Sequence, residues 1–461
     1  MSVREDAESI WRAGVEAVDS AAVVHRQISS DGGRLQIAGV HLDPADFDHI
    51  EVVGGGKAGA GMAKGVESAL LSSPWESRIS GWVNVPENCV RPLQRIHLHA
   101  ARPAGINEPT EAAIEGSAEI LKRVKGLSRR DVCIVLLSGG ASALLCCPVR
   151  EISLADKLAV TRALAASGAP IRELNLVRTQ LSQVKGGRLA AACRAGSQIA
   201  LIISDVIGDP LEVIGSGPTV ATPSGADEAL QVLSDRRLML STPPSVIAFL
   251  RMRHQEKREW TAASNQFRNV IVASNSIALQ AATAKAEQLG YRVLSLGSEN
   301  SGDAAAEGRQ LVTAMMELKA ADQTGDQRPV CCLSGGEPTV KLFPPEIAIM
   351  GSPDASGKGG RNQELVLSAV TAYQNAEDWS GLALLSGGTD GEDGPTDAAG
   401  AFADQALVQS IAGTGLNPAE YLARHDSWSF FAAVDGLFRT GPTHTNVMDL
   451  RVGLVRRTGE R

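Results

Sequence analysis

Short apolar runs alternate with helical patterns along most of the chain. The runs are rich in valine, isoleucine and leucine, and most of them end in glycine or serine, as buried strands of α/β folds commonly do. They cover residues 50–56, 79–85, 131–140, 198–206, 269–275, 292–298, 330–336 and 382–388. The pattern therefore predicts an α/β fold built on buried parallel strands.

The length of the chain predicts two domains. It has 461 residues, and a single hydrophobic core rarely grows beyond about 250 to 300 residues. Pro243 and Pro244 end the first series of runs, and a polar stretch at 251–266 follows. We place the boundary at 245–265, so that residues 1–250 and 260–461 form the two domains. Within the second domain, residues 330–450 hold the densest glycine motifs.

The charge and composition of the chain argue against several classes of binding partner. The formal net charge is −8 and the sequence contains no long basic run, which argues against nucleic acid or an anionic membrane surface. No apolar run is long enough for a membrane span, and the amino terminus does not resemble a signal peptide. The seven cysteines form no metal-binding spacing, so we expect reduced, buried thiols and a cytoplasmic location.

The turn at 54–59 has a G-x-G-x-x-G spacing with a lysine inside it. Gly54, Gly56 and Gly59 follow a predicted strand, and a helix that begins there would favour an anion. A dinucleotide site would also need an acidic residue at the end of the next strand, where this chain has Asn84. Three readings stay open: a dinucleotide site, a purely structural turn, and an anion site that uses Lys57.

Three further strand ends share an S-G-G sequence. Glycine allows a ligand to approach the backbone, and the hydroxyl groups add hydrogen-bond donors. An ordinary strand-to-helix turn explains any one of them, but three in one chain favour an extended anionic ligand. The phosphate-binding candidates on these turns and on the first one are Gly55, Gly56, Ser138, Gly139, Gly140, Ser142, Ser334, Gly335, Gly336, Thr389 and Asp390.

Cations lie in two other segments. Arg178 and Lys185 lie seven residues apart on a helical pattern, and Lys358 and Arg361 lie in the sequence GKGGRNQE. Free N–H groups and two cations before a helix suit a transferring phosphoryl group, although solvated surface charge is the ordinary alternative. Near the carboxyl terminus, the uncharged side chains Thr440, Thr443 and Asn446 suit a hydroxyl-bearing substrate or a phosphate.

Three acidic residues are candidate metal ligands. Phosphoryl transfer from ATP uses Mg²⁺, which takes one or two carboxylates together with phosphate oxygens and water. Asp205, Asp209 and Glu337 follow predicted strands and could supply them. Aspartate in a glycine-rich turn also commonly caps a helix or closes the turn. The Walker, lipase-type and zincin motifs are absent from the sequence.

Taken together, the motifs are similar to those of the class II glycerate 2-kinases, which carry a carboxyl-terminal MOFRL module. The resemblance runs from about residue 5 to residue 455, and its motifs occur in the same order. They are VVGGGKAGAGMA, LLSGGASALL, NLVRTQLSQVKGGRLA, SDVIGDPLEVIGSGPT, SGGEPTV, GKGGRNQELVL, GGTDGEDGPTDAAGA and TGPTHTNVMDL.

The resemblance implies a kinase that uses ATP and Mg²⁺ to phosphorylate the 2-hydroxyl of D-glycerate, giving 2-phosphoglycerate. It implies a Rossmann-like first domain, a second α/β domain and an active site in the cleft between them, and it leaves a homo-oligomer open. Lys57 and Arg361 match the family's catalytic residues. Some relatives carry the label hydroxypyruvate reductase, and an NAD(P)-dependent reductase or a kinase of a related hydroxy acid remains the alternative.

Three positions depart from the family's usual pattern. Arg102 stands where histidine is common, Ala141 replaces a glycine, and His444 follows Thr443 where the family has glycine. If these positions contact the acceptor, its identity could differ from D-glycerate.

Overall fold

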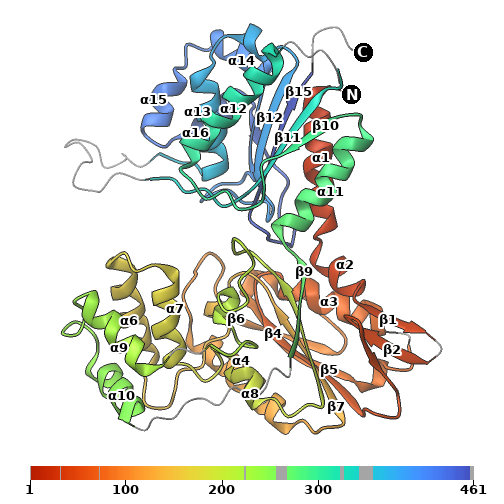
Figure 1. Ribbon diagram of the computed structural model, residues 1–461, viewed down its shortest axis with the longest axis vertical. Coiled ribbons are helices and arrows are strands. Elements are labelled where there is room, and N and C mark those ends of the chain that lie inside the picture. Colours follow the sequence, from red (N-terminus) through yellow and green to blue (C-terminus); the bar gives the residue numbers. More distant parts are fainter. Residues whose placement is uncertain are drawn as a thin grey trace. The chain divides into compact units, whose positions relative to one another are not determined.

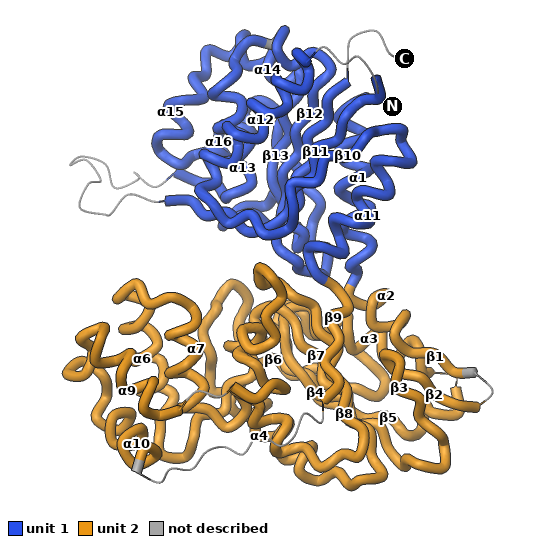
Figure 2. The backbone as a smooth tube through the Cα atoms, in the orientation of Figure 1, with its two compact units in different colours: residues 1–19, 274–461 blue, residues 20–273 orange. Residues whose placement is uncertain are grey.

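The computed structural model describes residues 2–31, 33–71, 73–222, 225–255, 267–321, 327–341 and 357–456. The chain folds into two compact units (Figures 1 and 2). Unit 1 contains residues 1–19 and 274–461, and unit 2 contains residues 20–273. Each unit is built around its own six-stranded sheet.

The sheet of unit 2 is entirely parallel, in the order β6-β5-β4-β7-β8-β9. From β4 the chain builds outward to β6 on one side, then returns to β7 and builds outward to β9 on the other. This is the doubly wound order, in which ligands collect at the carboxyl ends of the two central strands. The prediction of a Rossmann-like parallel sheet is confirmed. The strands are β4 His49–Gly55, β5 Ile79–Pro86, β6 Ile96–Arg102, β7 Asp131–Leu137, β8 Ser197–Ile203 and β9 Phe267–Ala273.

Alternate residues of the central strands of unit 2 face a helical layer. Cys133, Val135 and Leu137 of β7 pack in one core with Ile120 and Val124 of α4. The intervening β7 residues are buried as well, so the strand reads as one continuous apolar run. The helices of this sheet are α2 Ser20–His25, α3 Gly59–Leu70, α4 Glu111–Gly126, α5 Ala141–Leu144 and α8 Arg188–Ala192.

Two smaller parts complete unit 2. Four helices share a separate apolar core between Ile152 and Leu250, and they are α6 Leu154–Ala166, α7 Ile171–Gln180, α9 Ala226–Asp235 and α10 Pro244–Gln255. A three-stranded antiparallel sheet precedes β4, with strands β1 Ile28–Asp31, β2 Arg34–Ile37 and β3 Val40–Leu42.

The sheet of unit 1 is mixed, in the order β10-β11-β15-β12-β13-β14. Only β10 and β11 pair in parallel; every other pairing is antiparallel. The prediction of parallel strands is therefore wrong for most of this sheet. The cause is β15, an apolar strand that inserts between β11 and β12 and runs against both. The strands are β10 Arg292–Ser295, β11 Val330–Gly336, β12 Leu382–Gly388, β13 Gly400–Asp404, β14 Leu437–Phe438 and β15 Asp449–Val455.

Helices cover both faces of the unit 1 sheet. Cys331 and Leu333 of β11 pack with α1 and α11 in one core, while Val330 and Cys332 pack with α12 and α13 in the other. The helices are α1 Val3–Ala17, α11 Asn275–Gln288, α12 Ala304–Ala320, α13 Arg361–Ala372, α14 Gln405–Ala412, α15 Pro418–Ala423 and α16 Ser427–Ala433.

The two units do not follow the predicted division at either end. Helix α1 belongs to unit 1, because Ile10 and Trp11 are buried against its sheet and the Trp11 indole donates to the Gly387 carbonyl at 3.3 Å. Strand β9, predicted for the second domain, is an edge strand of the unit 2 sheet. The chain therefore passes from one unit to the other between residues 19 and 20 and between residues 273 and 274, whereas residues 256–266 of the predicted boundary lie outside the described residues.

No helix in the described ranges is long and apolar enough to cross a membrane. Six of the seven cysteines are buried, as predicted, and Cys89 is partly exposed.

Candidate active site

The turn that follows β7 is the centre of a charged cluster in unit 2. Its residues 138–142 lie at the carboxyl end of the sheet, beside the turn that follows β4. We use the name Lys57 cluster for Lys57, Arg102, Ser142, Arg178 and Lys185, the side chains that meet this turn.

The glycines of the β4 turn are required by a neighbouring backbone. Gly56 has a φ of +155°, and a Cβ there would stand 2.0 Å from the Ser138 hydroxyl oxygen; a Cβ on Gly54 would stand 2.0 Å from the Leu136 carbonyl oxygen. Only glycine allows two strand ends to approach so closely. The G-x-G spacing therefore reflects strand packing whether or not a ligand binds.

The backbone donors of this turn are already used inside the protein. The Lys57 N–H donates to the Gly139 carbonyl at 2.8 Å, and the Ala58 N–H donates to the Ser138 hydroxyl at 3.1 Å. The N–H groups of Gly56 and Gly59 also donate to carbonyls. The turn thus offers a ligand its lysine side chain rather than the row of amides that the sequence suggested.

Lys57 and Arg102 approach the same glycine. A Cβ on Gly140 would stand 3.4 Å from the Lys57 Cγ and 3.3 Å from an Arg102 Nη2. Lys57 is exposed, and its ammonium forms no hydrogen bond or ion pair with any residue that the structure describes. These two cations therefore flank one backbone position at the carboxyl end of the sheet.

Arg178 and Lys185 meet at the hydroxyl of Ser142, but the predicted shared helical face is wrong, because α7 ends at Gln180 and Lys185 lies in the turns between α7 and α8. The Lys185 ammonium donates to the Ser142 hydroxyl at 3.0 Å and to its carbonyl at 2.8 Å, and the Arg178 guanidinium donates to the same hydroxyl. Lys185 is fully buried. Burial lowers the pKa of Lys185 well below its ordinary value, and nearby Arg178 and Lys157 lower that pKa further.

The cluster carries more positive than negative charge. Arg178, Lys185 and nearby Lys157 form no ion pair with a carboxylate of the described residues, and burial lowers the pKa of all three. Asp205 approaches the same turn: a Cβ on Gly139 would stand 2.3 Å from its Oδ2. A site of this charge suits an anion.

Asp205 is also the predicted metal ligand whose position fits best. It follows β8 at the same end of the sheet, two strands from β4. Asp209 lies in the next turn with a φ of +54°. The described residues contain no group of three or more metal-ligating side chains, so Mg²⁺ could be held here only with phosphate oxygens and water, as is usual for this ion.

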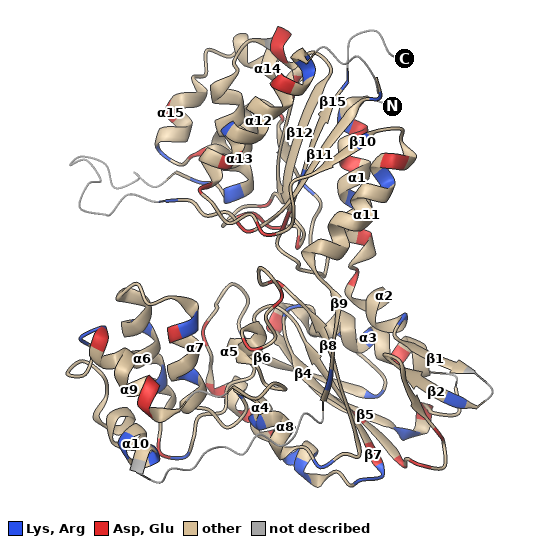
Figure 3. Cartoon of the chain, viewed as in Figure 1, with Lys and Arg blue, Asp and Glu red and all other residues tan. Residues whose placement is uncertain are grey.

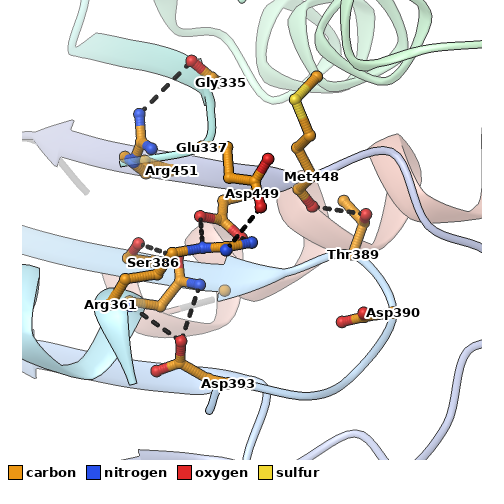
Figure 4. A network of polar contacts seen from close by, with 12 residues as sticks. Gly335, Glu337, Arg361, Ser386, Thr389, Asp390, Asp393, Met448, Asp449 and Arg451 are labelled. Carbon is orange, nitrogen blue, oxygen red and sulfur yellow. Dashed lines mark hydrogen bonds and ion pairs between the residues drawn. The ribbon is translucent and has the colours of Figure 1, made fainter. Parts of the chain in front are cut away.

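Unit 1 holds a second charged cluster around Arg361 (Figure 4). We use the name Arg361 cluster for Glu337, Arg361, Asp393 and Asp449. The Arg361 guanidinium donates to both oxygens of Asp449, at 2.7 and 3.0 Å, and to Glu337 at 2.8 Å. Burial opposes the charge of Arg361, but Asp449 and Glu337 outweigh it and raise the pKa of Arg361.

Asp393 caps the helix that Arg361 begins. Its carboxylate accepts from the N–H groups of Asn362 and Gln363 at 3.0 and 2.9 Å. A Cβ on Gly360 would stand 2.3 Å from the Asp393 carboxyl carbon, which explains a glycine before the helix. Burial raises the pKa of Asp393 to about 7. The first N–H groups of α13, which the sequence suggested for a phosphate, are thus occupied by Asp393.

The two S-G-G turns of unit 1 lie on either side of β15. Asp449 stands opposite Gly336 on β11 and opposite Gly388 on β12. A Cβ on Gly335 would stand 1.7 Å from the Asn275 side chain, and a Cβ on Gly336 would stand 2.1 Å from the Asn300 carbonyl. These glycines are explained by packing, as in the β4 turn.

Most remaining candidates of unit 1 hold its loops together. Thr389, which is fully buried, donates to the Met448 carbonyl at 2.6 Å, and Thr443 donates to the Thr389 carbonyl at 2.5 Å. The Lys358 ammonium lies 3.5 Å from the centre of the Trp428 ring. The other contacts are Arg451 and Asn300 with the Ser334 hydroxyl, Glu392 N–H with Asp390, Thr440 with the Gly441 carbonyl, and Met448 N–H with Asn446.

Three residues in these clusters, Arg102, Asp393 and Asp449, were not among the predicted site residues. Asp449 carried a weak signal, as a lone carboxylate directly before an apolar strand. Arg102 carried a clearer one, because it ends a strand and departs from the family pattern. Lys57 and Arg361 themselves belong to different units, and the predicted cleft between the domains stays a prediction.

Comparison with known proteins shows the family to which the chain belongs. Residues 6–251 match the family described as a domain of unknown function (DUF4147), and residues 330–449 match the MOFRL family. A human glycerate kinase is 34% identical, over 99% of this chain and 94% of its own length. The chain belongs to the MOFRL-containing glycerate kinase family.

Other relatives of the family cover nearly the whole chain. The crystal structure of a Thermotoga maritima glycerate kinase superposes with a TM-score of 0.81 at 32% identity, covering 98% of this chain and 99% of that one. A protein of Agrobacterium vitis named putative hydroxypyruvate reductase is 39% identical over 88% of this chain and 98% of its own length.

Family membership makes the chain a kinase. Its Lys57 cluster lies in the first matched region and its Arg361 cluster in the MOFRL region.

Proposed function

We propose that this kinase transfers the γ-phosphoryl group of ATP to the 2-hydroxyl of D-glycerate, giving 2-phosphoglycerate and ADP. The observation that carries the proposal is the surplus of positive charge on the 138–142 turn, at the switch point of a doubly wound sheet. ATP and glycerate are both anions, and the relatives named glycerate kinase share this chain over nearly its full length.

Lys57 is the proposed catalytic residue of unit 2. During transfer, the acceptor oxygen bonds to the γ-phosphorus as the bond to the β,γ-bridging oxygen breaks, and the hydroxyl proton passes to solvent or a nearby base. Negative charge on the transferring group is then stabilised by fixed cations. An ammonium with no partner among the described residues can make this contact without first breaking another.

Ser142, Arg178 and Lys185 would support the same turn. Ser142 accepts from both cations, so its hydroxyl proton is directed to Ser216, whose oxygen lies 2.9 Å away. Ser216 in turn donates to Asn175 at 3.0 Å. This chain of hydrogen bonds fixes the turn before the ligand arrives, which reduces the reorganisation required for transfer.

Mg²⁺ would be held by Asp205, with Asp209 and Glu337 as weaker candidates. Bound there, the ion would neutralise phosphate charge. The carboxylate of Asp205 lies against Gly139, so the chain itself supplies one oxygen ligand beside the phosphate-binding turn.

Arg361 would contact a phosphate through only one edge of its guanidinium, the edge that carries Nη1. Asp449 is fully buried and holds Nε and Nη2, whereas the side chain of Glu337 is 45% exposed and holds only Nη1. A phosphate oxygen could therefore replace Glu337 at Nη1 while Asp449 keeps the guanidinium oriented.

The decisive experiment is a coupled assay of ADP release. D-glycerate, L-glycerate, hydroxypyruvate and tartronate are each tested with and without Mg²⁺. We expect Mg²⁺-dependent ADP release with D-glycerate, and phosphorus NMR should identify 2-phosphoglycerate. If only another hydroxy acid is phosphorylated, D-glycerate is not the acceptor and this part of the proposal is wrong. If none is phosphorylated, the proposal fails.

A reductase is the second candidate, because the Agrobacterium vitis relative is named for hydroxypyruvate. Opposite Gly55 of β4, strand β5 carries Asn84 rather than an acidic residue that could hold a ribose. The Asn84 side chain is fully buried and donates to the Leu144 carbonyl at 2.8 Å. This contact speaks against a dinucleotide site. Oxidation of NADH or NADPH by hydroxypyruvate, followed by the absorbance of the reduced cofactor, would favour the reductase.

A further inference from the structure

Arg102 is a buried arginine that forms no ion pair with any carboxylate of the described residues. It is the last residue of β6 and only 4% of it is exposed. Its Nε is enclosed without an acceptor, and the guanidinium donates no hydrogen bond to any residue in the described ranges. Burial lowers the pKa of Arg102. A buried charge is ordinarily paired, because leaving it unpaired is costly.

The strand pairing aims Arg102 into the Lys57 cluster. Between β5 and β6 the register shifts, so that Val85 pairs with Ala100 but the next residue, Pro86, pairs with Arg102. Such an irregularity re-aims a side chain at the end of a strand. As a result, Arg102 Nη2 lies beside Gly140, next to Lys57.

The cluster contains two kinds of cation. Arg178 and Lys185 already donate to Ser142. Arg102 and Lys57 have no acceptor among the described residues and flank the same glycine. The side chains of Arg102 and Lys57 therefore have hydrogen-bond donors that could bind an anion.

We infer that Arg102 binds the carboxylate of the acceptor, whereas Lys57 serves the transferred phosphoryl group. The inference rests on the proposed function. A planar guanidinium matches the two oxygens of a carboxylate, while an ammonium is a point charge that suits a phosphoryl oxygen. Arg102 would thus select hydroxy acids over uncharged polyols such as glycerol.

The test uses the full-length protein with Arg102→Met, which removes the charge, and Arg102→Lys, which keeps it. D-Glycerate and glycerol are titrated by calorimetry without nucleotide, and kcat and KM are measured with ATP. For Arg102→Met we expect the Kd and KM for D-glycerate to rise on the order of 10- to 100-fold, with a smaller change in kcat and none in the KM for ATP. Arg102→Lys should fall between Arg102→Met and the wild type.

Thermal unfolding separates this role from a structural one. Because the arginine is unpaired, Arg102→Met should unfold at the same temperature as the wild type or higher without ligand, and D-glycerate should no longer raise that temperature. Arg123→Met is the matched control: Arg123 is paired with Glu51 and Glu119, so its loss should lower the unfolding temperature and leave the Kd for D-glycerate unchanged.

Two outcomes would overturn the inference. One is an Arg102→Met protein that binds D-glycerate with the wild-type Kd. The other, decisive if Arg102→Met does not fold, is an Arg102→Lys protein with the wild-type Kd and KM. Absence of ADP release by the wild type with every acid would instead reject the proposed function, and the calorimetric titration would still decide whether Arg102 binds a carboxylate.

Discussion

The two charged clusters have opposite electrostatic character. In the Lys57 cluster of unit 2, cations have few carboxylate partners and burial lowers the pKa of several of them. In the Arg361 cluster of unit 1, Arg361 is held by Asp449 and Glu337, with Asp393 nearby (Figure 4). Residues of both charges occur in both units (Figure 3). In the sequence, the two clusters were indicated by the same kind of motif, a lysine or arginine flanked by glycines. The motif alone does not say whether a cation is available to a ligand, since that depends on its partners.

The difference in pairing suggests that the Lys57 cluster binds ligand, whereas the Arg361 cluster also stabilises the fold. An unpaired cation is destabilising in the free protein and ready to bind, so changes to it should alter activity more than stability. A paired arginine is part of the fold, so changes to it should alter stability as well. The predictions below test this difference.

Arg361→Met should have the largest effect. It leaves Asp449 buried and unpaired, which should lower the free energy of unfolding by about 3–5 kcal/mol. Chemical denaturation measures this loss. The double variant Arg361→Met with Asp449→Asn should recover part of it, because the uncompensated charge is then gone. A single variant as stable as the wild type would contradict the pairing.

Asp393 should make stability depend on pH. Its pKa is raised from 3.8 to about 7 in the folded protein, so the folded state binds more protons than the unfolded state between these values. Stability from this group is full near pH 4 and is lost as pH rises to 7, by up to about 4 kcal/mol.

The Asp393→Asn variant isolates this contribution. Denaturation curves at several pH values should show a weaker loss of stability between pH 4 and 7 than in the wild type. Equal slopes for the two proteins would mean that Asp393 is ionised normally, and that the Arg361 cluster is more negative at neutral pH than its geometry indicates.

Lys57→Ala should abolish most activity without destabilising the fold. Losing one charged contact to the transition state costs about 3 kcal/mol, or roughly a hundredfold in kcat. Lys57 is exposed and no described residue pairs with it, so the unfolding temperature should not change. Lys64→Ala, at an exposed position of α3, the helix that follows the Lys57 turn, is the control and should keep full activity. Normal turnover by Lys57→Ala would rule out the catalytic role proposed for Lys57.

Thr389→Val should have the smallest effect. The hydroxyl bridges the Met448 carbonyl and the Val447 N–H, so its loss should cost about 1–3 kcal/mol of stability. The KM values for ATP and D-glycerate should stay close to those of the wild type. A large rise in either KM would show that Thr389 contacts a ligand, as the sequence first suggested.

The strands of the unit 2 sheet were predictable, because each depends on the apolar pattern of a short stretch of sequence. The runs at 50–56, 79–85 and 131–140 are rich in valine, isoleucine and leucine, so they read as buried strands, and they belong to the parallel sheet of unit 2. Strand direction in unit 1 was not predictable in this way. A strand buried on both faces has no alternation of polar and apolar residues, and β15 therefore gave no sign that it separates β11 from β12.

The site was predictable to a similar extent. Residue type and spacing identified Lys57, Arg178, Lys185 and Arg361 as cations near glycine-rich turns. They did not reveal that Arg361 is bound by Asp449, 88 residues away in sequence, nor that Arg102 has no hydrogen-bond or ion-pair partner in the part of the chain that the structure describes. Likewise, the glycines beside Ser138 and Asn275 looked like ligand contacts, but they are required by neighbouring protein atoms.

By itself, the sequence determined the fold class and the family, because these follow from composition and order along the chain, and it predicted a set of residues that could bind phosphate. Tertiary structure decided which of those residues are already occupied, that α1 belongs with the carboxyl-terminal unit, and that Arg102 joins Lys57. The physical reason is that hydrogen bonds and ion pairs are satisfied through space, between residues whose separation in the chain carries no information about their distance.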